Sequence, residues 1–205
     1  MINKVSELVI KGKAKLITAA VAEAVEGGCA PEAILNAMIG AMDVVGENFK
    51  NGTIFVPEML IAAKAMKKGV EVLKPLLSAG AAGALGKVVI GTVAGDLHDI
   101  GKNLVSMMIE SAGFEVIDLG VDVPVEKFVE AAQAGDVKIM ACSALLTTTM
   151  PALEATVAAL KATGKSYKVM VGGAPITQEF SDKIGADAYT PDAASAAKKA
   201  KELVG

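Results

Sequence analysis

The sequence predicts a helical N-terminal region followed by a doubly wound α/β domain with a five-stranded parallel sheet. Only helical periodicity appears before residue 80, and a run of small uncharged residues follows it. Beyond that run, five apolar β-like segments alternate with amphipathic ones, a pattern typical of a parallel sheet covered by helices on both faces. We therefore expect a helical domain at 1–78, a linker at 79–86 and an α/β domain at 87–205.

Four helices are expected in the first domain, near 5–9, 16–25, 31–49 and 57–73. Pro31 and Pro57 favour helix starts because the first helical N–H has no partner within the helix. Gly27 and Gly28 favour the end of the second helix. Short connections between the helices predict a four-helix bundle.

The second domain is expected to have a flavodoxin-like strand order of 2-1-3-4-5. Strands are predicted at 87–94, 114–119, 137–143, 168–171 and 186–189, and helices at 102–112, 124–134, 150–162, 177–184 and 191–203. In this order the first, third and fourth strands are neighbours. Glycine-rich or hydroxyl-rich loops follow these three strands, and ligands bind at the carboxyl ends of such strands.

Composition limits the compartment and the partners. The 205 residues are 53% hydrophobic, and the net charge of −3 comes without a basic stripe, so we do not expect a nucleic-acid partner. No apolar run predicts a membrane span, and the N-terminus does not resemble a signal peptide. Two cysteines form neither a disulfide framework nor a zinc cluster, and Cys142 is expected in the core. These features predict a cytoplasmic protein.

The sole histidine, His98, lies in the loop after the first predicted strand, in Gly-Asp-Leu-His-Asp-Ile-Gly at 95–101. A neighbouring carboxylate can fix one ring nitrogen while the other faces outward, which suits a metal ligand or a catalyst. The alternative is a hydrogen-bonded structural histidine.

Two further loops reach the same edge of the predicted sheet. Ser143 and the hydroxyls of Thr147, Thr148 and Thr149 follow the third strand, where threonines could simply cap the next helix. Gly172 and Gly173 follow the fourth strand; they could form a turn, or they could let a flat ligand approach the backbone.

Taken together, the three loops resemble the fingerprint of cobalamin-binding proteins of the methionine-synthase type. The residues that carry the resemblance are Asp96, His98, Gly101, Ser143, Leu145, Gly172 and Gly173. Segments 40–49 and 54–60 resemble the helical cap of the same family. The whole chain is similar to the small corrinoid proteins of methyltransferase systems that use methylamines, methanol, methoxylated aromatics or betaines.

The resemblance implies a role for each matched residue in the α/β domain. His98 would be the lower ligand of cobalt, with Asp96 and Thr149 as a hydrogen-bonded relay behind it. The remaining residues implied to contact the cofactor or its nucleotide tail are Leu97, Asp99, Ile100, Gly101, Ser143, Leu145, Thr147, Gly172, Gly173 and Ala193. Asp99 could instead cap the next helix.

In the helical domain, the resemblance implies that Phe49 and Val56 cover the upper face of the corrin and that Met42 also contacts the cofactor. Apolar cover would exclude water from a reactive metal centre. The alternative is that Phe49, Val56 and Met42 are core residues of the bundle.

The function implied by the resemblance is that of a methyl carrier rather than a free-standing catalyst. Its cofactor would be cobalamin or a related corrinoid, with cobalt cycling between Co(I) and methyl-Co(III). The implied partners are a substrate-specific methyltransferase, an acceptor methyltransferase using tetrahydrofolate or a thiol, and a reductive activator. Three alternatives stay open: a subunit of an adenosylcobalamin-dependent mutase, a cobalamin-based sensor, and a flavodoxin-like domain without a corrinoid.

Overall fold

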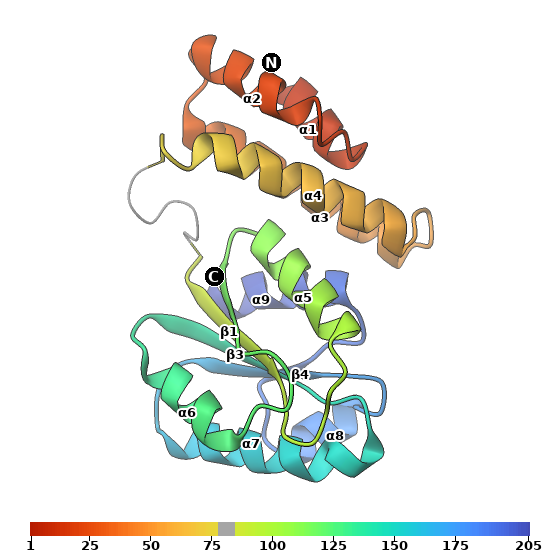
Figure 1. Cartoon of the computed structure of the whole chain (residues 1–205), viewed down its shortest axis with the longest axis vertical. Coiled ribbons are helices and arrows are strands. Elements are labelled where there is room, and N and C mark those ends of the chain that lie inside the picture. Colours follow the sequence, from red (N-terminus) through yellow and green to blue (C-terminus); the bar gives the residue numbers. More distant parts are fainter. Residues whose placement is uncertain (78–84) are drawn as a thin grey trace. The chain divides into compact units, whose positions relative to one another are not determined.

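The computed structural model describes residues 1–77 and 85–205, which form two compact units (Figure 1). The first unit contains α1 (Ile2–Ile10), α2 (Ile17–Glu26), α3 (Pro31–Lys50) and α4 (Val56–Leu73). These are the four helices that the sequence predicts. Most of the linker predicted at 79–86 lies outside the described residues.

The helical unit is held together by apolar side chains at helical spacing. Helix α1 packs against α2 and α3, and α4 packs against α2 and α3. Ile17, Ile34, Met38 and Leu73 are fully buried between these helices. The turn before α4 is fixed by the Glu58 carboxylate, which accepts a hydrogen bond from the helix's N-cap residue, a bond typical of helix starts.

The second unit is an α/β domain with the sheet order β2-β1-β3-β4-β5, as predicted. Its strands, all parallel, are β1 (Lys87–Thr92), β2 (Glu115–Asp118), β3 (Val137–Ser143), β4 (Lys168–Gly172) and β5 (Ala188–Tyr189). Its helices are α5 (Ile100–Ser111), α6 (Val125–Gln133), α7 (Met150–Ala162), α8 (Gln178–Lys183) and α9 (Ala193–Val204), with a short 3-10 turn at Thr147–Thr149.

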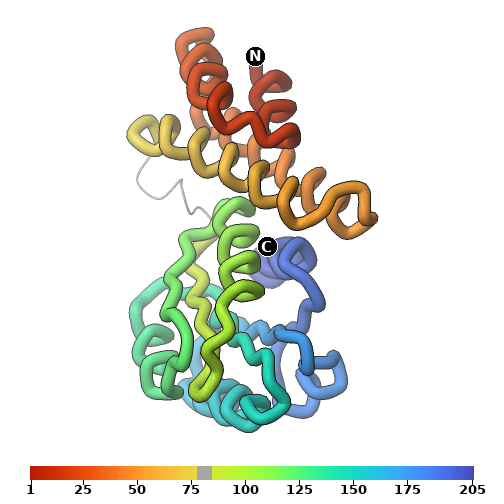
Figure 2. Tube along the Cα trace, turned by 45° about the vertical axis from the view of Figure 1, so that its right-hand side comes forward, coloured from red at the N-terminus to blue at the C-terminus, as the bar shows by residue number. Residues whose placement is uncertain are grey.

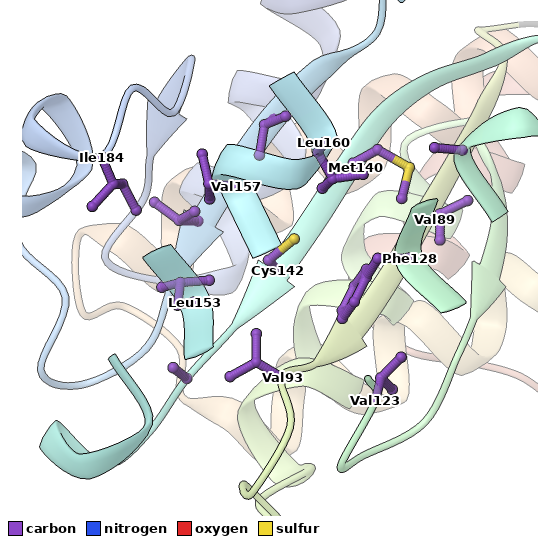
Figure 3. Close-up of a cluster of buried hydrophobic side chains, with 14 of the residues drawn as sticks. Val89, Val93, Val123, Phe128, Met140, Cys142, Leu153, Val157, Leu160 and Ile184 are labelled. Carbon is purple, nitrogen blue, oxygen red and sulfur yellow. The ribbon is translucent and has the colours of Figure 1, made fainter. Parts of the chain in front are cut away.

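Helices cover both faces of this sheet. Figure 1 and Figure 2 both place α5 and α9 on one face, and α6 and α7 on the other. The core under α6 and α7 is shown in Figure 3, where Phe128, Leu153 and Val157 pack around Cys142. Burial of Cys142 confirms its expected core position, and burial raises the pKa of its thiol to about 12. Among the described residues, no helix is both long and apolar enough to cross a membrane.

Candidate functional site

The three loops singled out in the sequence meet at the carboxyl edge of the sheet. Parallel pairing places Thr92, the last residue of β1, beside Ser143, and Ser143 beside Gly172. Hydrogen bonds continue past the strand ends, from the Val93 N–H to Ser143 and from the Ala144 N–H to Gly172. The loops after β1, β3 and β4 therefore start from one line across the sheet.

Asp96 is the centre of the polar contacts in this region, although its side chain is fully buried. One carboxylate oxygen, Oδ1, accepts the His98 N–H at 3.1 Å and lies 2.9 Å from His98 Nδ1. The other, Oδ2, accepts the Leu145 N–H at 2.7 Å and the Thr149 hydroxyl at 2.8 Å. Asp96 thus joins the loop after β1 to the loop after β3.

Asp96 remains a carboxylate despite its burial. Burial alone raises the pKa of Asp96, but the hydrogen bonds from Leu145, His98 and Thr149 outweigh it and hold the pKa well below its ordinary value. An ionised carboxylate only accepts hydrogen bonds, so the proton between Asp96 and His98 belongs to His98 Nδ1.

This contact fixes the tautomer of His98. With the proton on Nδ1, a neutral ring keeps its Nε2 lone pair free to bind a metal. The His98 side chain is 52% exposed, so the imidazole as a whole is accessible to a ligand. The Thr92 hydroxyl at the end of β1 donates to the His98 carbonyl at 2.9 Å, and this bond fixes the backbone of the histidine. The arrangement favours an outward-facing ligand over a buried structural histidine.

Thr149 does not cap helix α7 with its side chain. It occupies the N-cap position, but its hydroxyl makes no cap hydrogen bond. Instead the hydroxyl lies 2.8 Å from Asp96 Oδ2 and 2.9 Å from the Leu146 carbonyl. Its single proton can bond to only one of these oxygens at a time. The capping alternative is therefore wrong for Thr149.

Large apolar side chains are exposed around His98. Leu97 is 72% and Ile100 is 79% exposed, on either side of the histidine. Leu145 and Leu146, in the loop that bonds to Asp96, are also exposed. Exposed apolar residues that gather around a polar group are typical of a ligand-binding surface.

The other residues expected near a cofactor lie along the same edge, with varied exposure. Ser143 and Gly172 end β3 and β4 and are half-buried, whereas Thr147 and Gly101 are exposed. Asp99 accepts a hydrogen bond from the side chain of Asn103. Ala193, the first residue of α9, is buried.

Gly173 has a structural reason of its own to be glycine. Its φ is +132°, and a Cβ there would lie 1.8 Å from the Ala144 carbonyl oxygen. The protein backbone itself therefore excludes a side chain at this position. Gly172 has a looser environment, with the Thr190 carbonyl 3.4 Å from an added Cβ.

The three residues expected to cover the corrin from the helical unit differ in exposure. Met42 is buried within the bundle, whereas Phe49 and Val56 are half-buried. Phe55, just before Val56, is 67% exposed and was not singled out in the sequence. Exposure of an aromatic ring at a helix start depends on the local backbone, which hydrophobic periodicity does not report.

Comparisons with known proteins identify the family of the chain. A model of the B12 binding domain matches residues 86–198, and a second B12 binding domain model matches residues 1–74. The chain belongs to the B12-binding family. Its cofactor is therefore cobalamin or a related corrinoid, as the resemblance implies.

Two corrinoid proteins are similar to the chain over nearly all of its length. A dimethylamine corrinoid protein of Methanosarcina mazei is 45% identical over 100% of this chain and 97% of its own. A trimethylamine corrinoid protein of the same organism is 43% identical over 98% of this chain and 95% of its own.

Solved structures in the family share the fold as well. A cobalamin-binding protein from Desulfitobacterium hafniense matches with a TM-score of 0.84 and 32% identity, covering 100% of this chain and 99% of its own. The methanol:cobalamin methyltransferase complex of Methanosarcina barkeri matches with a TM-score of 0.87 and 31% identity, covering 99% of this chain and 79% of its own.

The residues at the carboxyl edge of the sheet fit a corrinoid. A neutral imidazole is a good donor to a transition metal, and a carboxylate on its other nitrogen raises its basicity. Here the imidazole of His98 is exposed and its carboxylate partner is buried. The exposed side chains of Leu97 and Ile100 suit the apolar part of a large flat ligand.

Proposed function

We propose that this protein carries a methyl group between two partner methyltransferases on the cobalt of its bound corrinoid. When bound, the corrinoid supplies a metal that accepts a methyl group from a donor and passes it to an acceptor. The observation that carries the proposal is the outward-facing His98 ring, whose Nδ1 is tied to a fully buried carboxylate.

In this proposal, His98 would hold the cobalt of the corrinoid and Asp96 would set the donor strength of the imidazole. The Asp96 carboxylate keeps a proton on Nδ1 and leaves Nε2 free for the metal. Thr149 can donate its proton either to Asp96 or to the Leu146 carbonyl. Rotation of this hydroxyl away from Asp96 leaves the carboxylate more basic, which strengthens its pull on the imidazole proton.

We assign the remaining edge residues to the lower face and the nucleotide tail of the corrinoid. Leu97, Ile100 and Leu145 offer apolar surface, and Thr147 is an exposed hydroxyl. Ser143, Gly172, Gly173 and Ala193 line the proposed position of the tail. In the helical unit, Phe49 and Val56 are proposed to shield the upper face.

The proposed loading partner is a methyltransferase specific for a methylated amine. Support comes from the full-length similarity to dimethylamine and trimethylamine corrinoid proteins. The proposed acceptor partner is a second methyltransferase that uses a thiol or tetrahydrofolate. A third proposed partner is a reductive activator that returns the corrinoid of the carrier to its reduced state. We place these reactions of one-carbon metabolism in the cytoplasm, where the unpaired Cys29 and Cys142 are suited to reducing conditions.

The axial assignment is tested by the absorbance spectrum of tag-free protein loaded with hydroxocobalamin. His98→Ala should change the spectrum of the loaded protein, because it removes the proposed ligand. Thr156→Val is a control, since Thr156 bonds only to the Ala152 carbonyl within α7. An unchanged spectrum for His98→Ala would exclude His98 as the ligand.

The donor assignment needs a separate measurement. Loaded protein, first reduced to the Co(I) state with a low-potential chemical reductant, is mixed with purified methyltransferases specific for dimethylamine, trimethylamine or methanol, each with its substrate. We expect methyl loading with an amine-specific enzyme. Loading only with the methanol-specific enzyme would overturn the proposed donor class and leave the carrier function intact.

A further inference from the structure

Lys102, in the first turn of α5, has a buried ammonium group that the proposed function does not use. Its side chain is only 2% exposed, and lysine is almost never fully buried without a partner. The ammonium donates to Asp118 Oδ2, at the end of β2, and to Asn103 Oδ1 at 2.8 Å. Lys102 therefore ties the start of α5 to the carboxyl end of β2.

The contacts of Lys102 extend toward His98 through Asn103. The Asn103 amide donates to Asp99 Oδ2 at 3.1 Å, and its backbone N–H donates to the Asp99 carbonyl at 2.7 Å. Asp99 directly follows His98. The polar chain therefore runs from the end of β2, through Lys102 and Asn103, to the residue beside the proposed metal ligand.

The far end of this chain is anchored to the sheet. Asp118 Oδ1 accepts the Gly120 N–H at 2.8 Å, and the Gly120 carbonyl accepts the Thr92 N–H at 3.0 Å. Thr92 in turn donates its hydroxyl to the His98 carbonyl. The backbone before and after the histidine is thus connected to the ends of β1 and β2.

The loop that carries His98 is consequently held from two sides. Asp96 anchors it toward β3, through Leu145 and Thr149. Lys102 anchors it toward β2. Asp96 Oδ1 contacts both the His98 N–H and the imidazole, and the residue after His98 is held by Asn103 in the first turn of α5. A shift of this turn would therefore move the backbone at His98 relative to a carboxylate that is bonded to the loop after β3.

We propose that Lys102 is a positioning residue for His98, and that it acts through Asp118 and Asn103 to keep the imidazole in the tautomer with Nε2 free. This inference rests on the proposed role of His98 as ligand. A purely structural lysine would contribute to folding stability and leave the ring of His98 unaffected. The two possibilities differ in what happens at the imidazole when Lys102 is replaced.

The tautomer can be observed without the cofactor, because the chain has a single histidine. Nitrogen chemical shifts of tag-free, corrinoid-free protein labelled with ¹⁵N-histidine distinguish the two neutral tautomers. A pH series isolates the spectrum of the neutral ring, and there the wild type should show a single tautomer with Nδ1 protonated. Lys102→Met keeps an unbranched chain of similar length but removes the ammonium. In this variant His98 should show a mixture of the two neutral tautomers instead of one.

Two further variants complete the test. Asn103→Ala leaves the Lys102–Asp118 pair in place and cuts only its link to Asp99, so it should give a smaller change in the same direction. Lys161→Met is the matched control, because Lys161 pairs with Asp187 at the opposite, amino edge of the sheet. It should leave the tautomer of His98 unchanged.

Binding of hydroxocobalamin provides the second readout. Loss of a group that orients a metal ligand typically weakens binding ~10-fold or more, and we expect about tenfold for Lys102→Met. Lys161→Met should bind like wild type.

An unchanged single tautomer in folded Lys102→Met and Asn103→Ala would overturn the positioning role. If Lys102→Met does not fold, the result for Asn103→Ala decides alone. The Lys102 variant could lose the single tautomer while the wild-type protein itself fails to bind hydroxocobalamin. That result would refute the proposed function and leave the positioning role supported.

Discussion

Replacement of Thr149 by valine tests whether the buried carboxylate is the main partner of this hydroxyl. Valine has nearly the same shape as threonine, so packing around the 5%-exposed side chain is preserved. The hydroxyl that lies 2.8 Å from Asp96 Oδ2 is removed. Oδ2 keeps only the Leu145 N–H as a donor.

The expected cost follows from the charge on the acceptor. Hydrogen bonds to charged groups contribute about 1.5–3 kcal/mol to stability, whereas neutral ones contribute about 0.5–1.5 kcal/mol. The free energy of unfolding of Thr149→Val should therefore fall by about 2 kcal/mol. Thr156→Val removes an equally buried hydroxyl whose acceptor is the neutral Ala152 carbonyl, and it should cost about 1 kcal/mol.

Urea denaturation of corrinoid-free protein, followed by circular dichroism, measures both variants. Thr149→Ser keeps the hydroxyl and should cost only the lost methyl group, about 1 kcal/mol. Because the pKa of Asp96 is held below its ordinary value, its stabilising contribution is complete at neutral pH and should be constant down to about pH 5. A Thr149→Val variant no less stable than Thr156→Val would refute a charged acceptor for this hydroxyl.

Two other predictions concern the same domain. Gly173→Ala should lower the free energy of unfolding by more than about 3 kcal/mol, because its φ is +132° and its Cβ would meet the Ala144 carbonyl. Gly164→Ala, with a φ of +67° and no atom within 4 Å of its Cβ, should cost only about 1 kcal/mol; equal costs in urea denaturation would contradict the collision. Burial raises the pKa of Asp187, but hydrogen bonds from Lys161 and the Val169 N–H lower it overall. The stabilisation from Asp187 should be complete above about pH 5 and lost as the pH falls through the lower folded pKa, so a pH-independent effect of Asp187→Asn on urea midpoints would refute it.

The fold could be predicted because its signals are local and repeated. Alternation of β-branched runs with amphipathic segments indicates a parallel sheet, and the predicted strand order is that of a flavodoxin-like sheet. The ends of elements were less predictable. Helix α5 begins at Ile100, two residues before the expected start, and β5 is limited to Ala188 and Tyr189. Hydrophobic periodicity marks the middle of an element, whereas its ends depend on specific hydrogen bonds.

The site could be predicted only as far as its motif extends. His98 and Asp96 are two residues apart in the sequence, and their contact is found in the structure. Thr92 and Lys102 were missed, because Thr92 appears as one more β-branched strand residue and Lys102 as an ordinary polar helix residue. Their partners come from segments that the sequence does not place beside them: Asp118, for example, lies at the end of another strand. Such contacts exist only after the sheet has formed.

The burial of Cys142 also decides how this protein can be labelled. A thiol whose pKa is raised to about 12 stays protonated and unreactive near neutral pH, while the half-buried Cys29 is accessible to small alkylating reagents. One dye or spin label can therefore be attached to the helical unit of the natural sequence. With the lone imidazole as a magnetic-resonance reporter in the other unit, each half of the chain carries its own probe without engineered residues.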